Sequence, residues 1–310
     1  MGVSIATFNV KNLLEPANSQ AAAVLPGKIA WLASKLTACD ADVVGLQEIG
    51  SGALLSRVLD AMHARGGYGA PVLGTVDARG IGCALLSRLP ILSSWVQTSD
   101  ALPLPVFREG DPPPFGARLP LRRGVVHARV DAGAARLIDV FVAHFKSARP
   151  VRARDASGIE LGPSSARERA EGQLRSLIWR AGEGLFVRGR VDEVLAGDPD
   201  ARIAVVGDLN DEPGSWAVRA VCSEGQGALL DACASIPAEL RYSCLHGGRR
   251  IQIDHVLVTA GLHARIQAAR IDNADLRQHE PLPEARPAAQ AVQETPTIDS
   301  DHAPVIVQFG

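Results

Sequence analysis

An acidic and an amide side chain follow the apolar segment 203–206 at alternate positions, in a stretch (205–210) that reads VVGDLN. Because alternate side chains of an extended chain share one face, we expect Asp208 and Asn210 to point the same way. Such a pair at the end of a strand could position a metal-bound phosphate or a water molecule. An Asx turn that simply closes the strand would explain this stretch equally well.

Three further apolar segments carry an acidic or imidazole side chain at one end. They are 42–46, followed by Glu48; 136–143, followed by His144; and 303–309, preceded by Asp301 and His302. Asn9 also follows an alternating segment, 3–8. Asp254 lies inside an expected strand, 249–258, and is flanked by apolar residues. A buried carboxylate is costly unless it is paired, so we expect Asp254 to contact a histidine or an arginine.

These side chains together suit the hydrolysis of a phosphate ester. Carboxylate and amide oxygens with few nitrogen ligands favour Mg²⁺ or Mn²⁺ over zinc. An aspartate–histidine pair, with a second acid to orient the imidazole, suits general-base activation of water. Amides and a second histidine suit the stabilisation of charge on a phosphate in the transition state. The residue types therefore predict a metal-assisted phosphoester hydrolase.

The elements that must position these residues can be read from spacing. Apolar residues at helical intervals predict helices over 28–39, 51–62 and 165–197, with Ser51 capping the second and Ser165 with Glu168 capping the third. The expected buried stripe of the third helix is Leu174, Leu177, Ile178, Ala181 and Leu185. Polar or proline-rich stretches at 99–121, 148–163 and 272–297 are expected loops. Paired strands with helices between some of them predict one domain, residues 1–310, of two packed, mainly antiparallel sheets with outer helices.

Composition and charge limit the classes of function. The 310 residues are 46% apolar and 21% charged, which provides a substantial core and excludes a disordered chain. A net charge of −2 argues against broad electrostatic capture of nucleic acid but leaves a local basic groove open. Aromatic residues make up only 4%, too few for a platform that stacks single strands.

Cysteine usage and the distribution of apolar residues bear on the cellular compartment of the protein. Five scattered cysteines without a CxxC pair are typical of core residues in a reducing compartment. We expect a cytoplasmic protein without a membrane span, because no secretory leader precedes the strand at 3–8 and no apolar run is long enough to cross a bilayer. The sequence indicates no protein partner.

Taken in order, the motifs resemble the series of the endonuclease/exonuclease/phosphatase (DNase I-like) superfamily. They are Thr7-Phe8-Asn9, Leu46-Gln47-Glu48, Ala143-His144-Phe145, Gly207-Asp208-Leu209-Asn210, Ile253-Asp254-His255 and Ser300-Asp301-His302. Each motif is weak alone, but the ordered set spans almost the whole chain. The resemblance implies a four-layer α/β sandwich and a divalent-metal-dependent phosphoesterase, most specifically a bacterial nuclease-like member acting on DNA or RNA.

The resemblance also implies a role for each matched residue. Metal binding falls to Glu48 with Asn9 and Asp301, and His302 takes a proton from the attacking water while Asp254 orients an imidazole. The remaining residues act on the water and the phosphate: Asp208 and Asn210 position them, His144 donates to a phosphate oxygen, and Arg118 and Lys146 bind the substrate phosphate.

Two points qualify the subfamily. The resemblance to bacterial nuclease-like members implies that Asp77 or Arg79 lies near His144. In the first motif, this sequence has Lys11 at a position where many nucleases of the family have a polar neutral or acidic residue. Nucleic acid is the first substrate class; a small or lipid-derived phosphate ester is the second, favoured by the near-neutral charge and few aromatics. A catalytically silent binding module is the third alternative, opposed by the presence of both histidines and all the acids.

Overall fold

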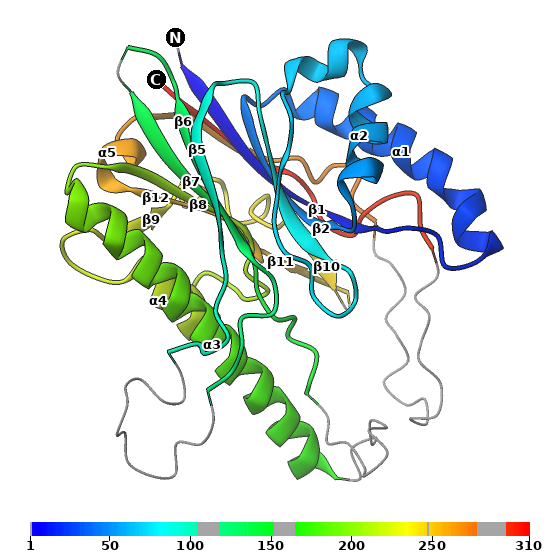
Figure 1. The fold of residues 1–310 in the computed structure, drawn as a ribbon. Helices are drawn as coiled ribbons and strands as arrows, with labels where there is room; N and C mark the ends of the chain where they lie inside the picture. Colours follow the sequence, from blue (N-terminus) through cyan, green and yellow to red (C-terminus); the bar gives the residue numbers. More distant parts are fainter. Residues whose placement is uncertain (1, 104–117, 135, 152–164, 247, 278–295) are drawn as a thin grey trace.

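Two six-stranded sheets form the centre of the molecule (Figure 1). The computed structural model describes residues 2–103, 118–134, 136–151, 165–246, 248–277 and 296–310. In sheet order, the first sheet contains β13 (Ile266–Ile271), β14 (Val305–Phe309), β1 (Val3–Leu13), β2 (Val43–Ile49), β4 (Gly82–Ser87) and β3 (Val72–Leu73). The second contains β5 (Ile91–Gln97), β6 (Val125–Asp131), β7 (Leu137–His144), β8 (Arg202–Asp208), β12 (Asp254–Thr259) and β9 (Leu229–Asp231).

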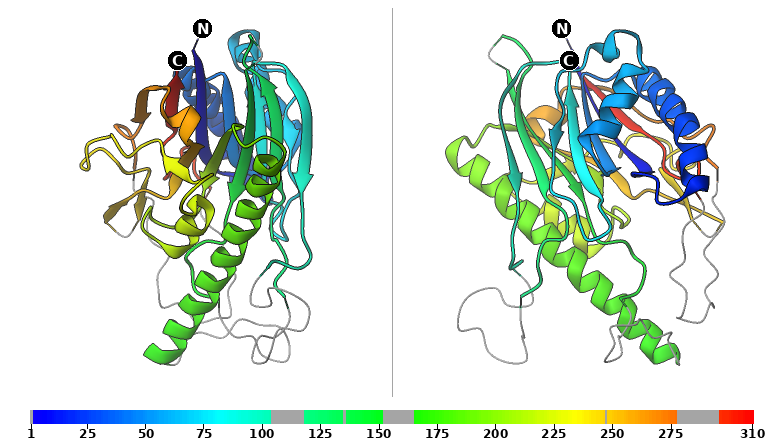
Figure 2. Two further views of the ribbon diagram at one scale, coloured as in Figure 1. Left: turned by 90° about the vertical axis from the view of Figure 1, so that its left-hand side faces the viewer. Right: turned by 45° about the vertical axis from the view of Figure 1, so that its right-hand side comes forward.

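The sheets pack face to face, and helices cover their outer faces (Figure 2). Helices α1 (Ser19–Cys39) and α2 (Gly52–Asp60) cover the first sheet, and α3 (Ala166–Gly197) and α4 (Trp216–Cys222) cover the second. Alternation along β7 shows the layering, since Val140 and Val142 belong to the core between the sheets while Phe141 faces the helices. The predicted four-layer α/β sandwich is confirmed.

Each sheet has one parallel pair at its centre, and all its other pairs are antiparallel. The pairs are β1–β2 and β7–β8, and β8 packs across both β1 and β2. Because the four strands run so that their carboxyl ends meet, the polar residues at those ends come together in one region. The topology thus places four predicted site residues close together: Asn9, Glu48, His144 and Asp208.

Gly207 permits the close approach of β8 to β7. Its φ is 148°, and a Cβ atom there would lie 1.9 Å from the carbonyl oxygen of Ala143, its partner in the parallel register. No side chain fits such a distance. Gly207 therefore fixes the position of the residue that follows it, Asp208.

The two predicted helix caps are confirmed, but the first helix begins earlier than predicted. Ser51 and Ser165 accept the backbone N–H groups of Leu54 and Glu168, as predicted. Helix α1 begins earlier than predicted, at an N-cap formed by Asn18, and continues through Pro26. The helix therefore accommodates a proline in its interior.

The predicted buried stripe of α3 is wrong at its amino-terminal half. Leu174 is 55% exposed and Leu177 is 36% exposed. The helix extends past the end of the sheet (Figure 1), so this half presents a polar face to the protein instead: Ser176, Arg180 and Glu183 are buried.

The segment 249–258 is also two elements instead of one strand. Residues Arg249–Ile251 form β11, which pairs with β10 (Cys244–His246) in a separate ribbon, and β12 begins at Asp254. Smaller helical elements are α5 (Ala260–His263) and the 3₁₀ turn His63–Gly67. Among the helices that the structure describes, none has the length and apolar character needed to span a membrane.

Candidate active site

Three neighbouring strands of the second sheet place a histidine and two aspartates side by side. His144 ends β7 and pairs with Asp208 at the end of β8, which in turn pairs with Asp254 at the start of β12. Residues in cross-strand register share a face, so the three side chains project together. All three are buried, with Asp254 at 0% and Asp208 at 1% exposure.

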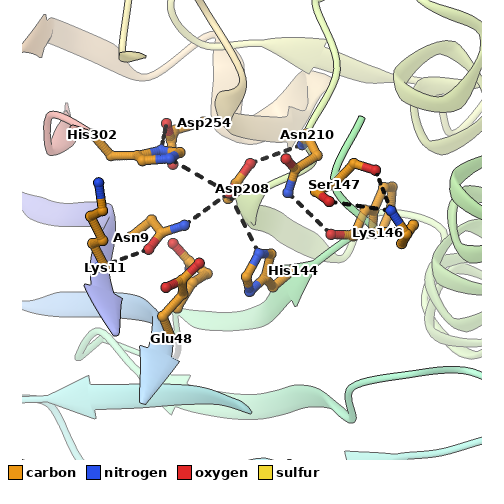
Figure 3. A network of polar contacts seen from close by, with 12 residues as sticks. Asn9, Lys11, Glu48, His144, Lys146, Ser147, Asp208, Asn210, Asp254 and His302 are labelled. Carbon is orange, nitrogen blue, oxygen red and sulfur yellow. Dashed lines mark hydrogen bonds and ion pairs between the residues drawn. The ribbon is translucent and has the colours of Figure 1, made fainter. Parts of the chain in front are cut away.

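The first sheet contributes an amide and a carboxylate from the facing strands (Figure 3). Asn9 on β1 donates through Nδ2 to Oδ2 of Asp208 at 2.9 Å. Glu48 lies within β2 at a register irregularity, with a φ of 66°, and its Oε2 accepts the backbone N–H of Asn12 at 2.7 Å. Irregularities of this kind redirect side chains next to functional sites. The two sheets thus share one polar cluster.

His302 completes the cluster from the segment before β14. Its Nδ1 lies 2.8 Å from Oδ2 of Asp254, and its Nε2 lies 3.9 Å from Oδ2 of Asp208. Because an ionised carboxylate only accepts, the pair with Asp254 keeps the proton on Nδ1 and leaves Nε2 to face Asp208. The expected pairing of Asp254 with a histidine is confirmed.

Serines hold both members of this pair in place. Ser243 donates its hydroxyl to Oδ2 of Asp254 at 2.7 Å, and Ser300 donates to the carbonyl of Asn9 at 2.8 Å while accepting the N–H of His302 at 3.1 Å. The imidazole is thereby fixed relative to both sheets.

Burial and charge shift the pKa of each central group. Burial raises the pKa of Asp208 to about 7, and Asp254 nearby adds to the rise. Burial, with the charges of Arg123, His302 and Arg79, lowers the pKa of His144 well below 6.5. For His302 burial acts in the lowering direction, but the carboxylate of Asp254 outweighs it and raises the pKa well above 6.5.

Replacing Asp254 with asparagine should move the pH profile of any reaction that uses His302 as a base. The imidazole accepts a proton only when neutral, so the wild-type rate should rise with pH through the raised pKa of His302. Without the Asp254 charge this pKa falls, the rising limb moves to lower pH, and the plateau drops about 10–100-fold because the tautomer is no longer fixed. Initial rates between pH 5 and 9 measure both effects; an unshifted limb would contradict the pairing.

Asp208, Asp254 and His302 form a group whose ligand atoms lie within 4.8 Å of one another and could hold a metal ion. The donor set fits a divalent cation, and Oδ1 of Asp254 is buried with no hydrogen-bond partner among the described residues. The Nδ1–Asp254 contact, however, commits the histidine to a hydrogen bond in this arrangement. The oxygen-rich side of the cluster, with Glu48 and Asn9, suits Mg²⁺ or Mn²⁺ on chemical grounds.

Asn210 and Arg79 lie next to the cluster. The backbone N–H of Asn210 donates to Oδ1 of Asp208 at 2.9 Å, and its Nδ2 donates to the carbonyl of Phe145 at 3.1 Å. Arg79 is near enough to act on the pKa of His144, as expected. Asn210 therefore connects Asp208 to the segment that follows His144.

Lys146 and Arg118 are not drawn into the cluster. The Nζ of Lys146 donates to the carbonyls of Ser147 and Arg149 at 2.8 and 2.9 Å, on the side of Asn210 away from Asp208 (Figure 3). Arg118 is exposed. A phosphate contact by either residue stays a prediction.

Two buried side chains that the sequence did not predict, Arg123 and Glu183, hydrogen-bond to the backbone at and after His144. Arg123 pairs with the buried carboxylate of Asp77 and donates to the carbonyls of His144 and Phe145. Glu183 on α3 accepts the N–H of Lys146 at 2.6 Å, and burial raises its pKa to about 7. Neither Glu183 nor Arg123 lies in a sequence pattern that predicts burial.

Comparisons with known proteins agree with this arrangement. Residues 6–302 match the Endonuclease/Exonuclease/phosphatase family, and no curated protein matches the chain. An endonuclease/exonuclease/phosphatase family protein from Bacteroides thetaiotaomicron has a similar structure, with a TM-score of 0.60 and 19% identity over 99% of this chain and 94% of that one. The 3'-5' exonuclease (NExo) from Neisseria meningitidis is similar at 0.57 and 19%, covering 99% of both chains, and truncated TDP2 from Caenorhabditis elegans at 0.58 and 14%, covering 99% and 97%. At these identities the structures establish the fold, and the match over most of the sequence establishes that the chain belongs to the endonuclease/exonuclease/phosphatase family.

Proposed function

We propose that this protein is a divalent-metal-dependent phosphodiesterase that hydrolyses DNA or RNA with an activated water. The observation that carries the proposal is the pair of buried Asp254 with His302. Nε2 of His302 faces Asp208 within one polar cluster that also contains Glu48, a carboxylate suited to a metal. A binding module has no use for an oriented imidazole of this kind.

Glu48 and Asn9 would hold the cation, with their oxygen atoms as ligands. When bound, a divalent cation polarises a phosphoryl oxygen and offsets the charge that develops on it. Glu48 suits this role because its backbone irregularity and its contact with Asn12 fix a carboxylate that remains partly exposed.

The protein side chains divide the remaining work. Nε2 of His302 takes the proton of the attacking water, and Asp254 stabilises the imidazolium that forms. Asp208, held by Asn9 and by the N–H of Asn210, orients that water. His144 is neutral at physiological pH because its pKa is lowered, so it can donate one hydrogen bond to a phosphate oxygen without repelling a cation.

The nucleic-acid substrate is supported by the similar Neisseria meningitidis structure, which is described as a 3'-5' exonuclease. A small or lipid-derived phosphodiester is the alternative, and the net charge of −2 is the observation that favours it. Arg123 and Lys146, two of the cations near the cluster, are largely used in contacts within the protein.

Substrate assays with Mg²⁺ or Mn²⁺ test this proposal. Plasmid DNA, labelled single-stranded DNA and RNA, and bis-p-nitrophenyl phosphate should be compared over a salt series. The nuclease proposal predicts cleavage of nucleic acid that weakens steeply with salt, because contacts to several phosphates release counterions. Hydrolysis of the small diester alone would support the alternative, and no turnover of any substrate would favour a binding role.

A further inference from the structure

Lys11 places an ammonium group directly against one of the predicted metal ligands. Its Nζ lies 2.9 Å from Oδ2 of Asp301, and the side chains are 17% and 24% exposed, so the contact is partly shielded from water. An ion pair of this geometry at a partly buried site is stronger than one on the open surface. Asp301 thus already faces a cation that belongs to the protein.

The backbone around Lys11 is built to hold it there. Lys11 and Asn12 both have a φ of 52°, a left-handed conformation that asparagine adopts readily but that is unfavourable for lysine. The β1–β2 register shifts between Asn9 and Leu13. Two site residues stabilise the irregularity: Oδ1 of Asn9 accepts the N–H of Lys11 at 2.9 Å, and Oε2 of Glu48 accepts the N–H of Asn12 at 2.7 Å.

We infer that Asp301 is the counter-ion of Lys11 and not a ligand of the divalent cation, and that the Lys11 ammonium acts as a built-in positive charge beside the metal. The inference rests on the proposed function and narrows its metal site to the Glu48–Asn9 side. With Oδ2 held 2.9 Å from the ammonium, the charge of the Asp301 carboxylate is largely offset by Lys11, and a divalent cation bound to this carboxylate would lie close to that positive charge. Asn12, the second left-handed residue of this turn, donates its backbone N–H to Glu48. The turn at the end of β1 therefore positions both the Lys11 ammonium and the Glu48 carboxylate.

Metal binding distinguishes this assignment from the one in which Asp301 is a ligand. Changing Asp301 alone would leave the Lys11 charge uncompensated and repel a cation in either case. The informative variant is therefore the charge-balanced pair Lys11→Gln with Asp301→Asn. Mn²⁺ is the probe, its dissociation constant is measured by calorimetry and by electron paramagnetic resonance, and circular dichroism confirms that each variant is folded.

The double variant should bind Mn²⁺ with an affinity within about threefold of wild type, because no ligand is lost and the net charge is unchanged. Lys11→Gln alone should bind severalfold more tightly, since a nearby positive charge is removed. Glu48→Gln should bind at least about tenfold more weakly. A double variant as weak as Glu48→Gln would overturn the inference while leaving the metal site in place. Unchanged binding in Glu48→Gln would overturn both the inference and the proposed metal site.

Discussion

Replacing His302 with alanine is expected to lower the rate of phosphodiester hydrolysis by about 10²–10⁴-fold, the usual contribution of a positioned general base. Nε2 of His302 faces Asp208, while Nδ1 is held by Asp254 at 2.8 Å, so the variant removes the only oriented imidazole nitrogen of this pair. The loss should fall on kcat, because the side chain acts on the water and not on the bulk of the substrate.

The fold should survive this change. The His302 side chain is 11% exposed at the edge of the site, and the backbone of the segment is held separately by Ser300 and by a bridge to Cys244. His63→Ala, an exposed histidine in the 3₁₀ turn, is the matched control. Equal kcat for the two variants, with unchanged thermal unfolding, would contradict the assigned base.

Replacing Gly207 with alanine is expected to destabilise the protein by roughly 2–5 kcal/mol, the combined scale of overpacking and backbone strain. The new Cβ would lie 1.9 Å from the carbonyl oxygen and 2.8 Å from the carbonyl carbon of Ala143, both backbone atoms that cannot rotate away. The strands β7 and β8 would have to separate at the point where His144 and Asp208 pair, so residual folded protein should also lose activity.

Gly189→Ala on α3 is the matched control, because no heavy atom of another element lies within 4 Å of its Cβ position. Alanine favours a helix over glycine by about 1 kcal/mol, so this variant should be as stable as wild type or more so. Urea unfolding measures both free energies. A Gly207→Ala protein with wild-type stability would show that β8 can shift without cost.

The strand ends and the central pairing could be predicted from the sequence because local rules determine them. Asp254 lies in an apolar segment, so it needed a partner, and His302 supplies it. Ser51 and Ser165 carry their helix caps within a few residues of sequence. The cap residues act within a few residues of the chain, and the need of Asp254 for a partner follows from its burial alone.

The features that escaped prediction depend on contacts between distant elements. The Lys11–Asp301 pair joins residues at opposite ends of the chain, and it exists because two left-handed residues turn the end of β1. Glu183 is buried where α3 contacts the segment after His144, whereas Leu174 is exposed in the half of α3 that extends past the end of the sheet. Helical periodicity cannot distinguish these faces, since it records apolarity and not what the helix covers.

Hydrolysis by this protein should depend both on a bound divalent metal and on His302. One sample of wild type and one of His302→Ala should be assayed on plasmid DNA and on bis-p-nitrophenyl phosphate, first with Mg²⁺, then with excess chelator, then with Mg²⁺ restored. Wild type should cleave at least one substrate, stop with chelator and recover with Mg²⁺, while the variant should be at least about 10²-fold slower whenever Mg²⁺ is present. Hydrolysis that persists in chelator, or that is equal in the two proteins, would contradict this dependence.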